Sequence, residues 1–148
     1  MTRGRVIHTG EALVDIVLRV SHLPRRGGDV FADSYAFSVG GAFNSMAAAA
    51  RDGAEVIWPG AQGDGEFGSR VRAAMAGEGI KVLAEASPGQ DTGFSVAMVE
   101  PDAERTFVST VGAEGTPDAR VFDGLEVASG DVVYVSGYSF AVPGPRDV

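Results

Sequence analysis

Two adjacent glycines, Gly40 and Gly41, join a stretch of alternating residues to an alanine-rich segment. The alternating stretch, 34–39, is typical of a strand, and the alanine-rich segment, 43–52, is typical of a helix. Because glycine has no Cβ, a glycine pair here lets the backbone turn sharply and lets another group approach the main chain closely. Asn44 falls in the first turn of the predicted helix, where its side chain either caps the helix or faces a ligand. We expect this junction to bind a small polar molecule.

Strands and helices alternate along much of the chain. Apolar, β-rich runs predict strands within 6–20 and at 56–58, 80–84 and 132–135, the last of them buried. Apolar residues at helical spacing predict a second helix over 66–76, and Gly53 ends the first helix as a C-cap glycine would. Strands that alternate with helices indicate an α/β fold built on a parallel sheet.

Two segments outside this pattern, around 18–39 and 92–111, look like hairpin insertions. In the second, β-rich runs flank the polar turn 100–104, and Arg105 beside that turn is expected to be a solvated charge. The two insertions therefore predict a separate antiparallel layer.

The composition is that of a globular chain of one domain. Its 148 residues carry a net charge of −8 and a single lysine, Lys81, which argues against nucleic-acid binding because that affinity comes from clustered basic residues. The absence of cysteine excludes disulfides and thiolate metal sites and fits a reducing compartment. No apolar run reaches the ~20 residues of a membrane span, and the N-terminus does not resemble a secretory leader. We expect a cytoplasmic protein.

Four ionisable side chains near the N-terminus are candidates for chemistry. Glu11 and Asp15 are four residues apart, or about 13 Å along one strand, which is too far for the ~5–9.5 Å carboxylate pair of a glycosidase. Asp15 interrupts an otherwise apolar strand, so it is either a solubility charge on an edge strand or a buried carboxylate that needs polar partners. His8 and His22 lack the spacing of a metal site.

The segment 63–68 fits the G-x-G-x-x-G pattern of dinucleotide-binding loops, and Glu85 lies where a ribose-binding acid would. Two features count against a dinucleotide site. Four residues separate the preceding strand from Gly63, and Asp64 and Glu66 would place negative charge beside a pyrophosphate. A structural turn at the start of a helix is the competing interpretation.

Taken together, these motifs resemble the N-terminal half of the ribokinase-like (PfkB) sugar kinases. The run Gly40-Gly41-Ala42-Phe43-Asn44, followed by Gly53 and Gly63, is similar to the first family signature, with Met46 departing from the usual small residue. The start Gly10-Glu11-Ala12-Leu13-Val14-Asp15 is similar to that of fructokinase-like and 2-keto-3-deoxygluconate kinase-like members. The segments 63–68 and 104–107 are similar to the family's G-x-D-x-x-G stretch and to the turn of its lid hairpin.

The resemblance implies a three-layer α/β core with a mainly parallel sheet and a small antiparallel β-lid, of which this chain holds the N-terminal portion. It implies that Asp15 and Asn44 bond substrate hydroxyls and that Gly40 and Gly41 let the sugar meet the main chain. Apolar lid residues such as Phe94 and Val96 either pack on the sugar or belong to the hairpin core. Tyr138, which follows the last strand, lies where a βα loop could reach the sugar. The lid often pairs with a second subunit, which implies a homodimer.

The second family signature, D-T-x-G-A-G-D, does not occur in these 148 residues. In such kinases it supplies the catalytic base and the helix N-terminal amides that stabilise the transferred phosphoryl group. The resemblance therefore implies that the intact enzyme uses ATP and Mg²⁺, and that this chain alone binds neither and is inactive.

Three functions remain open on the sequence. The first is a kinase that phosphorylates a small sugar or sugar acid, with ribose and nucleosides as further substrate classes. The second is a noncatalytic sugar-binding or dimerisation module that keeps the lid. The third is an NAD(P)-binding protein that uses the segment 63–68.

Overall fold

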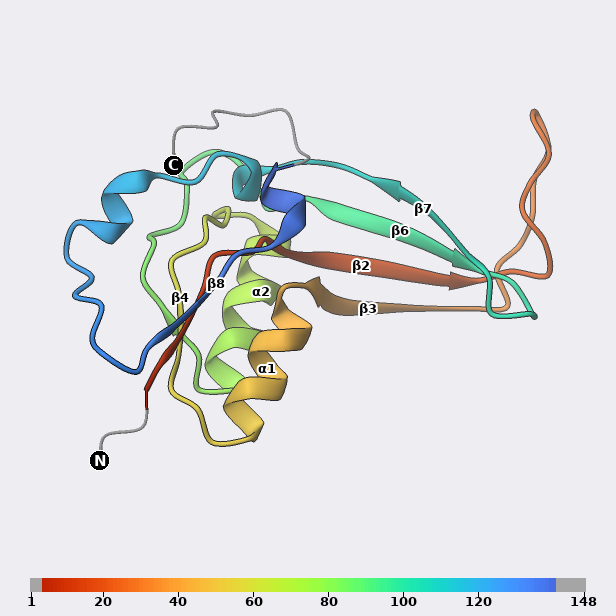
Figure 1. The fold of residues 1–148 in the computed structure, drawn as a ribbon. Coiled ribbons are helices and arrows are strands. Elements are labelled where there is room, and N and C mark those ends of the chain that lie inside the picture. The colour runs from red at the N-terminus through yellow and green to blue at the C-terminus, as the bar shows by residue number, and fades with distance from the viewer. Residues whose placement is uncertain (1–3, 141–148) are drawn as a thin grey trace.

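The computed structural model describes residues 4–140, which form two four-stranded sheets (Figure 1). Sheet A is parallel in the order β5-β4-β1-β8 and comprises β1 (Val6–His8), β4 (Val56–Trp58), β5 (Lys81–Val82) and β8 (Val132–Tyr134). Sheet B has the order β3-β2-β6-β7 and comprises β2 (Ala12–Arg19), β3 (Ser34–Gly41), β6 (Phe94–Val99) and β7 (Arg105–Ser109). The α/β fold expected from the alternating pattern is confirmed.

Two α-helices, α1 (Phe43–Arg51) and α2 (Glu66–Gly77), lie side by side next to sheet A (Figure 1). Three short 3₁₀ helices follow later in the chain: η1 (Ala113–Gly115), η2 (Ala119–Phe122) and η3 (Gly137–Phe140). Both α-helices end where glycine punctuation predicts, since Gly53 and Gly79 follow them with φ of +90° and +68°. These are left-handed values that glycine adopts without a Cβ clash.

The hydrophobic core lies between the two helices and the strands. Met46 of α1 and Met75 of α2 are fully buried against β4, together with Val14 of β2. Trp58 of β4 is 0% exposed, and its indole Nε1 donates to the Gly10 carbonyl oxygen at 2.9 Å. Because this hydrogen bond satisfies the one polar atom of the indole, the ring can be buried completely. It also ties β4 to the turn between β1 and β2, next to the pocket described below.

Sheet B projects away from the body of the molecule as an arm (Figure 1). We expected an antiparallel layer, and the pairs β2–β3 and β6–β7 are antiparallel. The sheet as a whole is mixed, however, because β2 pairs with β6 in parallel. Between these two strands the chain runs back along β3 and then passes through α1, β4, α2 and β5, so it re-enters sheet B in the direction of β2. The arm begins at Ala12, earlier than the residue near 18 expected from sequence.

The sequence predicts a buried strand at 132–135, and the prediction of burial is wrong. Strand β8 does form there, but Val132, Val133 and Tyr134 are 59%, 51% and 50% exposed. β8 is the outermost strand of sheet A and pairs only with β1 among the described residues. Within residues 4–140, no helix is both long enough and apolar enough to cross a membrane.

Candidate functional site

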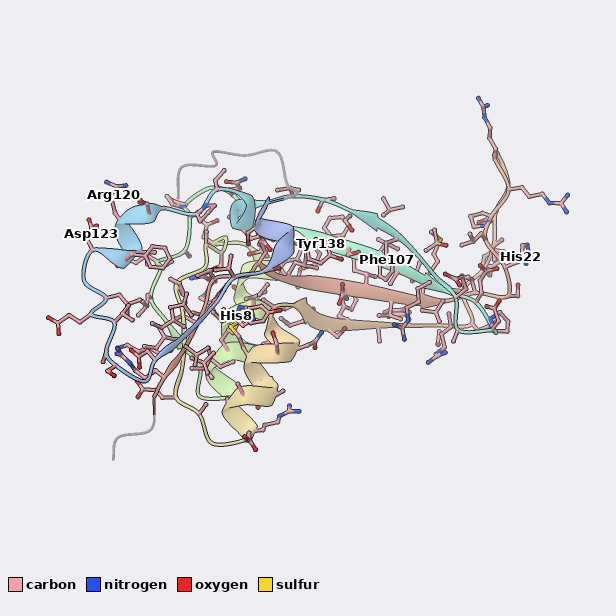
Figure 2. The ribbon with its side chains drawn as sticks, in the orientation of Figure 1. His8, His22, Phe107, Arg120, Asp123 and Tyr138 are labelled. Carbon is pink, nitrogen blue, oxygen red and sulfur yellow. The ribbon has the colours of Figure 1, made fainter. Side chains whose placement is uncertain are left out.

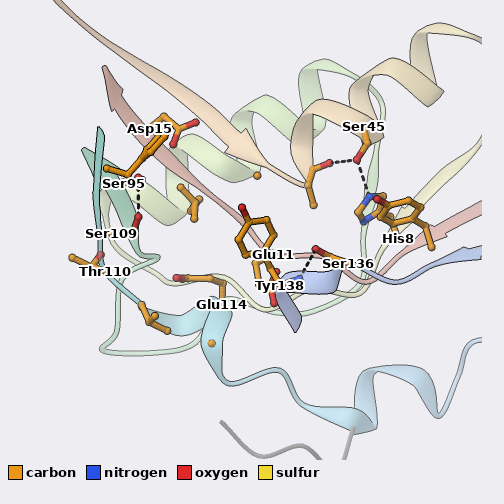
Figure 3. Close-up of a pocket in the computed structure, with 17 residues that line it drawn as sticks. His8, Glu11, Asp15, Ser45, Ser95, Ser109, Thr110, Glu114, Ser136 and Tyr138 are labelled. Carbon is orange, nitrogen blue, oxygen red and sulfur yellow. Dashed lines mark hydrogen bonds between the residues drawn. The ribbon is translucent and has the colours of Figure 1, made fainter. Parts of the chain in front are cut away.

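A pocket of about 610 Å³ lies where sheet B meets β1, β8 and the start of α1 (Figure 3). This volume falls in the range of about 300–1,000 Å³ that is typical of small-molecule sites. Its polar lining comes from both sheets and comprises His8, Glu11, Asp15, Ser45, Ser95, Ser109, Thr110, Glu114, Ser136 and Tyr138. Apolar contact surface comes from Leu13, Ala42, Phe107, Val111 and Tyr134. The pocket therefore combines several hydrogen-bonding groups with apolar walls.

A row of polar residues crosses sheet B on the face that forms the pocket. Strand register places Ser38, Asp15, Ser95 and Ser109 directly beside one another on four successive strands. The Ser95 and Ser109 hydroxyls are hydrogen-bonded at 2.9 Å, and Ser95 is buried. Side chains alternate between the two faces of a strand. The neighbours of Asp15 on β2, Val14 and Ile16, therefore point to the opposite face and pack in the core. Phe94, which precedes Ser95 on β6, does the same.

Asp15 and Gly40 are packed together in this row. A Cβ on Gly40 would lie 1.9 Å from an Asp15 carboxylate oxygen, so only glycine leaves room for the carboxylate in its present position. No described residue donates a hydrogen bond to this partly buried carboxylate, and its desolvation raises the pKa of Asp15. The first glycine of the pair is thus required by a side chain on the neighbouring strand.

Gly41 serves a different purpose. Its φ is +63°, and a Cβ there would lie 2.6 Å from the carbonyl oxygen of Glu11. The same carbonyl oxygen accepts a hydrogen bond from the Ala42 N–H at 2.9 Å. The second glycine therefore makes the tight turn from β3 into α1, as the sequence pattern predicts.

The start of α1 contradicts one of the two interpretations of Asn44, namely that its side chain caps the helix. The N-cap is Ala42, no side chain caps the helix, and Asn44 lies within its first turn. Asparagine at 44 is therefore not a capping residue. Its side chain is exposed and does not line the pocket, whereas the next residue, Ser45, does.

His8 lines the pocket and belongs to a series of hydrogen bonds that connects Gly10, His8, Ser45 and Ala42. The Gly10 N–H donates to His8 Nδ1 at 3.1 Å, which leaves the proton on Nε2, 2.8 Å from Ser45 Oγ. Ser45 Oγ donates in turn to the Ala42 carbonyl oxygen at 2.9 Å. His8 is 2% exposed, its ring stacks on Tyr134 with a centroid distance of 4.4 Å, and burial lowers its pKa. The histidine is thus held neutral in one tautomer.

The two histidines lie apart in the structure. His22 lies near the distal end of the arm, far from His8 (Figure 2). Within residues 4–140, no three His, Cys, Asp or Glu side chains gather as a metal site would require.

Glu114 is a pocket residue that the sequence reasoning missed. It is 7% exposed on η1, and its two carboxylate oxygens accept hydrogen bonds from the Gly93 N–H at 2.7 Å and the Gly112 N–H at 2.9 Å. These two bonds fix the position of the buried carboxyl group. Gly93 lies 21 residues before Glu114, so no local pattern marks the carboxylate as part of a site.

Phe94 and Val96 do not line the pocket. They lie on the opposite face of β6, where the Phe94 ring packs on Phe67 of α2 at a centroid distance of 5.3 Å. The hairpin-core interpretation is therefore the one that matches their position. Ser95, between them, is the residue that faces the pocket. Tyr138 on η3 does line the pocket, so the segment after β8 reaches it.

The glycine-rich segment at the start of α2 is occupied by Asp91. Its carboxylate accepts hydrogen bonds from the Phe67 N–H at 3.0 Å and the Gly68 N–H at 2.8 Å. Although desolvation opposes this, the backbone N–H groups hold the pKa of Asp91 below its ordinary value. A Cβ on Gly65 would lie 2.3 Å from the Asp91 carboxyl carbon. The amides that a pyrophosphate would need are thus bound to the protein's own carboxylate.

Comparison with solved structures places the fold among kinases. A ribokinase from Cryptococcus neoformans var. grubii serotype A, in complex with ADP, is 24% identical with a TM-score of 0.76 over 91% of this chain and 41% of its own. An adenosine kinase from Sinorhizobium meliloti is 20% identical with a TM-score of 0.75 over 97% of this chain and 50% of its own. The ribokinase-like fold expected from the motifs is confirmed.

Sequence comparison gives the family. A protein of Escherichia coli strain K12, described as the uncharacterized sugar kinase YegV, is 37% identical over 143 residues, or 96% of this chain. The chain spans 44% of the length of that relative. The family model of the pfkB family carbohydrate kinases matches residues 4–148. The chain therefore belongs to the pfkB family of carbohydrate kinases.

Proposed function

We propose that the protein containing this chain transfers the γ-phosphoryl group of ATP to a hydroxyl of a small sugar or sugar acid, which binds in the pocket at the base of sheet B. Family membership supports the carbohydrate kinase activity. The pocket assignment is carried by the Asp15 carboxylate, which lines the pocket and accepts no hydrogen bond from the described residues. A partly desolvated carboxylate with free acceptor sites is well suited to bind adjacent hydroxyl groups.

The residues around Asp15 support the same role. Gly41 lines the pocket without a side chain, so a sugar can come close to its main chain. Gly40 is proposed to act through Asp15, because its missing side chain leaves room for the carboxylate. Asn44 is retained as a proposed second hydroxyl ligand on the resemblance of its motif alone, because its exposed side chain does not line the pocket. Phe94 and Val96 are left out of the proposed site because neither lines the pocket, and the Phe94 ring packs on Phe67 of α2.

ATP and Mg²⁺ belong to the proposal for the whole protein. The described residues gather no metal-binding cluster, and the sequence lacks the D-T-x-G-A-G-D signature. We therefore assign no step of phosphoryl transfer to these residues and no catalytic base among them. The 148-residue chain alone is expected to bind neither ATP nor Mg²⁺ and to show no kinase activity.

A dimer through the arm is the proposed assembly. Tyr35 and Phe37, which share the face of β3 that points away from the pocket, are 72% and 43% exposed, and neighbouring exposed apolar side chains are candidates for burial by a partner. The same observation favours the second candidate function, a noncatalytic sugar-binding or dimerisation module. The two functions differ in whether any sugar stimulates ATP turnover by the whole protein.

The test is ADP release by the full-length protein over a panel of pentoses, hexoses, ketoses, sugar acids and nucleosides. With the best substrate, Asp15→Asn is expected to lower kcat/KM by roughly 10- to 100-fold, as loss of a hydrogen bond to a charged group would. Asp29→Asn, which changes an exposed carboxylate in the loop between β2 and β3, should leave kcat/KM unchanged. No ADP release with any sugar would overturn the kinase proposal. Equal activity of the two variants would overturn the pocket assignment.

A further inference from the structure

The acidic side chains that line the pocket are not matched by basic ones. Three carboxylates line it: Glu11 before β2, Asp15 on β2, and Glu114 on η1. Figure 3 shows Glu11 and Glu114 beside Tyr138, with Asp15 next to the Ser95–Ser109 pair. Both oxygens of Glu114 accept backbone N–H groups, from Gly93 and Gly112. A ligand in this pocket therefore lies beside three carboxyl groups.

No positive side chain in the described part of the chain balances these carboxylates. No arginine or lysine is among the lining residues. His8 does line the pocket, but its Nδ1 accepts the Gly10 N–H, so the ring is uncharged. Several arginines are paired elsewhere with Asp131, Glu78, Glu66 and Asp118.

Two arginines share the pocket-facing side of sheet B. Arg19 on β2 and Arg105 on β7 flank Val99 across the sheet, at the distal end of the arm. Arg19 is four residues beyond Asp15, which corresponds to about 13 Å along a strand. Both arginines are exposed and neither lines the pocket. They do not neutralise the carboxylates at its base.

The polar groups without charge favour hydroxyl-rich ligands. The hydroxyls of Ser109 and Tyr138 line the same space, and a hydroxyl can donate as well as accept. Ser45 Oγ also lines it, but its proton is already donated to the Ala42 carbonyl oxygen, so it can only accept. Such a set pairs well with the hydroxyl groups of a sugar, which also donate and accept. A carboxylate or phosphate on the ligand would instead face like charges in a partly desolvated site.

We propose that this pocket selects an uncharged polyhydroxylated sugar and rejects sugar acids and sugar phosphates. The inference rests on the proposed function and narrows its substrate class. Because kcat/KM discrimination follows from differential binding, repulsion by partly desolvated carboxylates should favour the neutral sugar by at least about 100-fold. Added salt should reduce this preference, since it screens charges that remain in contact with water.

The experiment uses the full-length protein and matched pairs: a neutral hexose or ketose against the corresponding aldonic, uronic and 6-phosphate forms. ADP release and ligand-induced shifts in Tm are measured for each. The neutral member is expected to give the higher kcat/KM and the larger Tm shift. A preference for any acidic member overturns the inference while leaving the kinase proposal intact.

Two variants identify the cause of the discrimination. Glu11→Gln removes one lining carboxylate that makes no side-chain hydrogen bond to the described residues, and it should reduce the preference for the neutral sugar by about 10-fold. Glu104→Gln, at the exposed hairpin turn, is the matched control and should leave the preference unchanged. Equal preferences in the two variants overturn the electrostatic explanation. If Arg105→Gln abolishes turnover of an acid, the arm supplies the missing cation and the inference is wrong.

Failure of the underlying function is recognised separately. If no sugar of either kind releases ADP, the kinase proposal fails, and the Tm shifts alone decide the inference. Stabilisation by neutral sugars alone then supports it. Equal or greater stabilisation by acids, or none by any sugar, overturns it.

Discussion

Close packing between single residues defines the pocket floor. Gly40→Ala would place a Cβ 1.9 Å from the Asp15 carboxylate and so displace it. We expect KM for the sugar to rise by roughly 10-fold or more, since a bound hydroxyl loses a charged acceptor. The check is a double-mutant cycle with Asp15→Ala. In the Asp15→Ala background, Gly40→Ala should raise KM little further, because the carboxylate that its Cβ would contact is absent.

The control for this cycle is Gly77→Ala at the end of α2, where no atom lies within 4 Å of the added Cβ. That variant should leave KM unchanged and stabilise the fold by about 0.4–1 kcal/mol. Additive effects of Gly40→Ala and Asp15→Ala on KM would contradict the contact described between the two residues.

The stability effect of Asp15 should oppose its role in binding. Burial raises the pKa of Asp15 above its ordinary 3.8, so the ionised form destabilises the fold at neutral pH and this cost disappears below 3.8. Asp15→Asn should therefore raise Tm at pH 7, with a gain that shrinks as the pH falls through the folded pKa. Thermal unfolding from pH 3.5 to 8 measures this. A variant with lower Tm at pH 7 would contradict it.

His8 should make the fold sensitive to mild acid. Its pKa is lowered by burial from the ordinary 6.5, so the unfolded chain takes up the proton first. The stability that neutral His8 provides is complete above 6.5 and is lost as the pH falls through the folded pKa. Denaturant unfolding between pH 4.5 and 8, together with NMR titration of the imidazole, measures the effect. His22→Gln should retain this pH dependence, and His8→Gln should lose it.

At the scale of elements, Asp91 caps α2 from a distant segment of the chain. Asp91→Ala removes the acceptor of the Phe67 and Gly68 N–H groups and should destabilise the fold by about 0.5–2 kcal/mol. Because the pKa of Asp91 is lowered, the stability it provides is present above 3.8 and is lost as the pH falls through the folded value. Urea unfolding of Asp91→Ala, with Asp29→Ala as control, measures the loss. Equal midpoints for the two would contradict the cap.

The helices and most strands could be predicted because their signals are local. Alanine content marks α1, apolar residues at helical spacing mark α2, and Gly53 marks the end of α1. The parallel pairing of β2 with β6 could not be predicted in this way, because it depends on a crossover through the other sheet. The sequence also did not indicate which face of β6 points toward the pocket. Phe94 packs on α2, whereas the next residue, Ser95, lines the pocket.

The candidate site was partly predictable, chiefly where its residues belong to the motifs at 10–15 and 40–44. Asp15, Gly40 and Gly41 follow from the sequence pattern, and the structure places them together. Glu114 depends on backbone donors from two separate segments, so no short pattern reveals it.

At the scale of the whole molecule, β8 leaves an apolar strand at the edge of sheet A. Val132 and Val133 are 59% and 51% exposed, and exposed strand edges pair readily with other chains. The 148-residue chain expressed by itself should therefore associate, and it should elute above its mass of 15.3 kDa. Val133→Lys should shift it towards the monomer in size-exclusion chromatography with light scattering. A monomeric parent chain would contradict this prediction.

The mixed pairing of sheet B has a mechanical consequence. Asp15 on β2 and Ser95 on β6 lie side by side on neighbouring strands, and the same strands continue into the projecting arm. A sugar held by these side chains is therefore bound to the arm itself, as well as to the wall beside α1. Any swing of the arm would carry the ligand's contacts with it. A ligand bound at Asp15 would therefore be coupled to the position of the arm through β2 and β6.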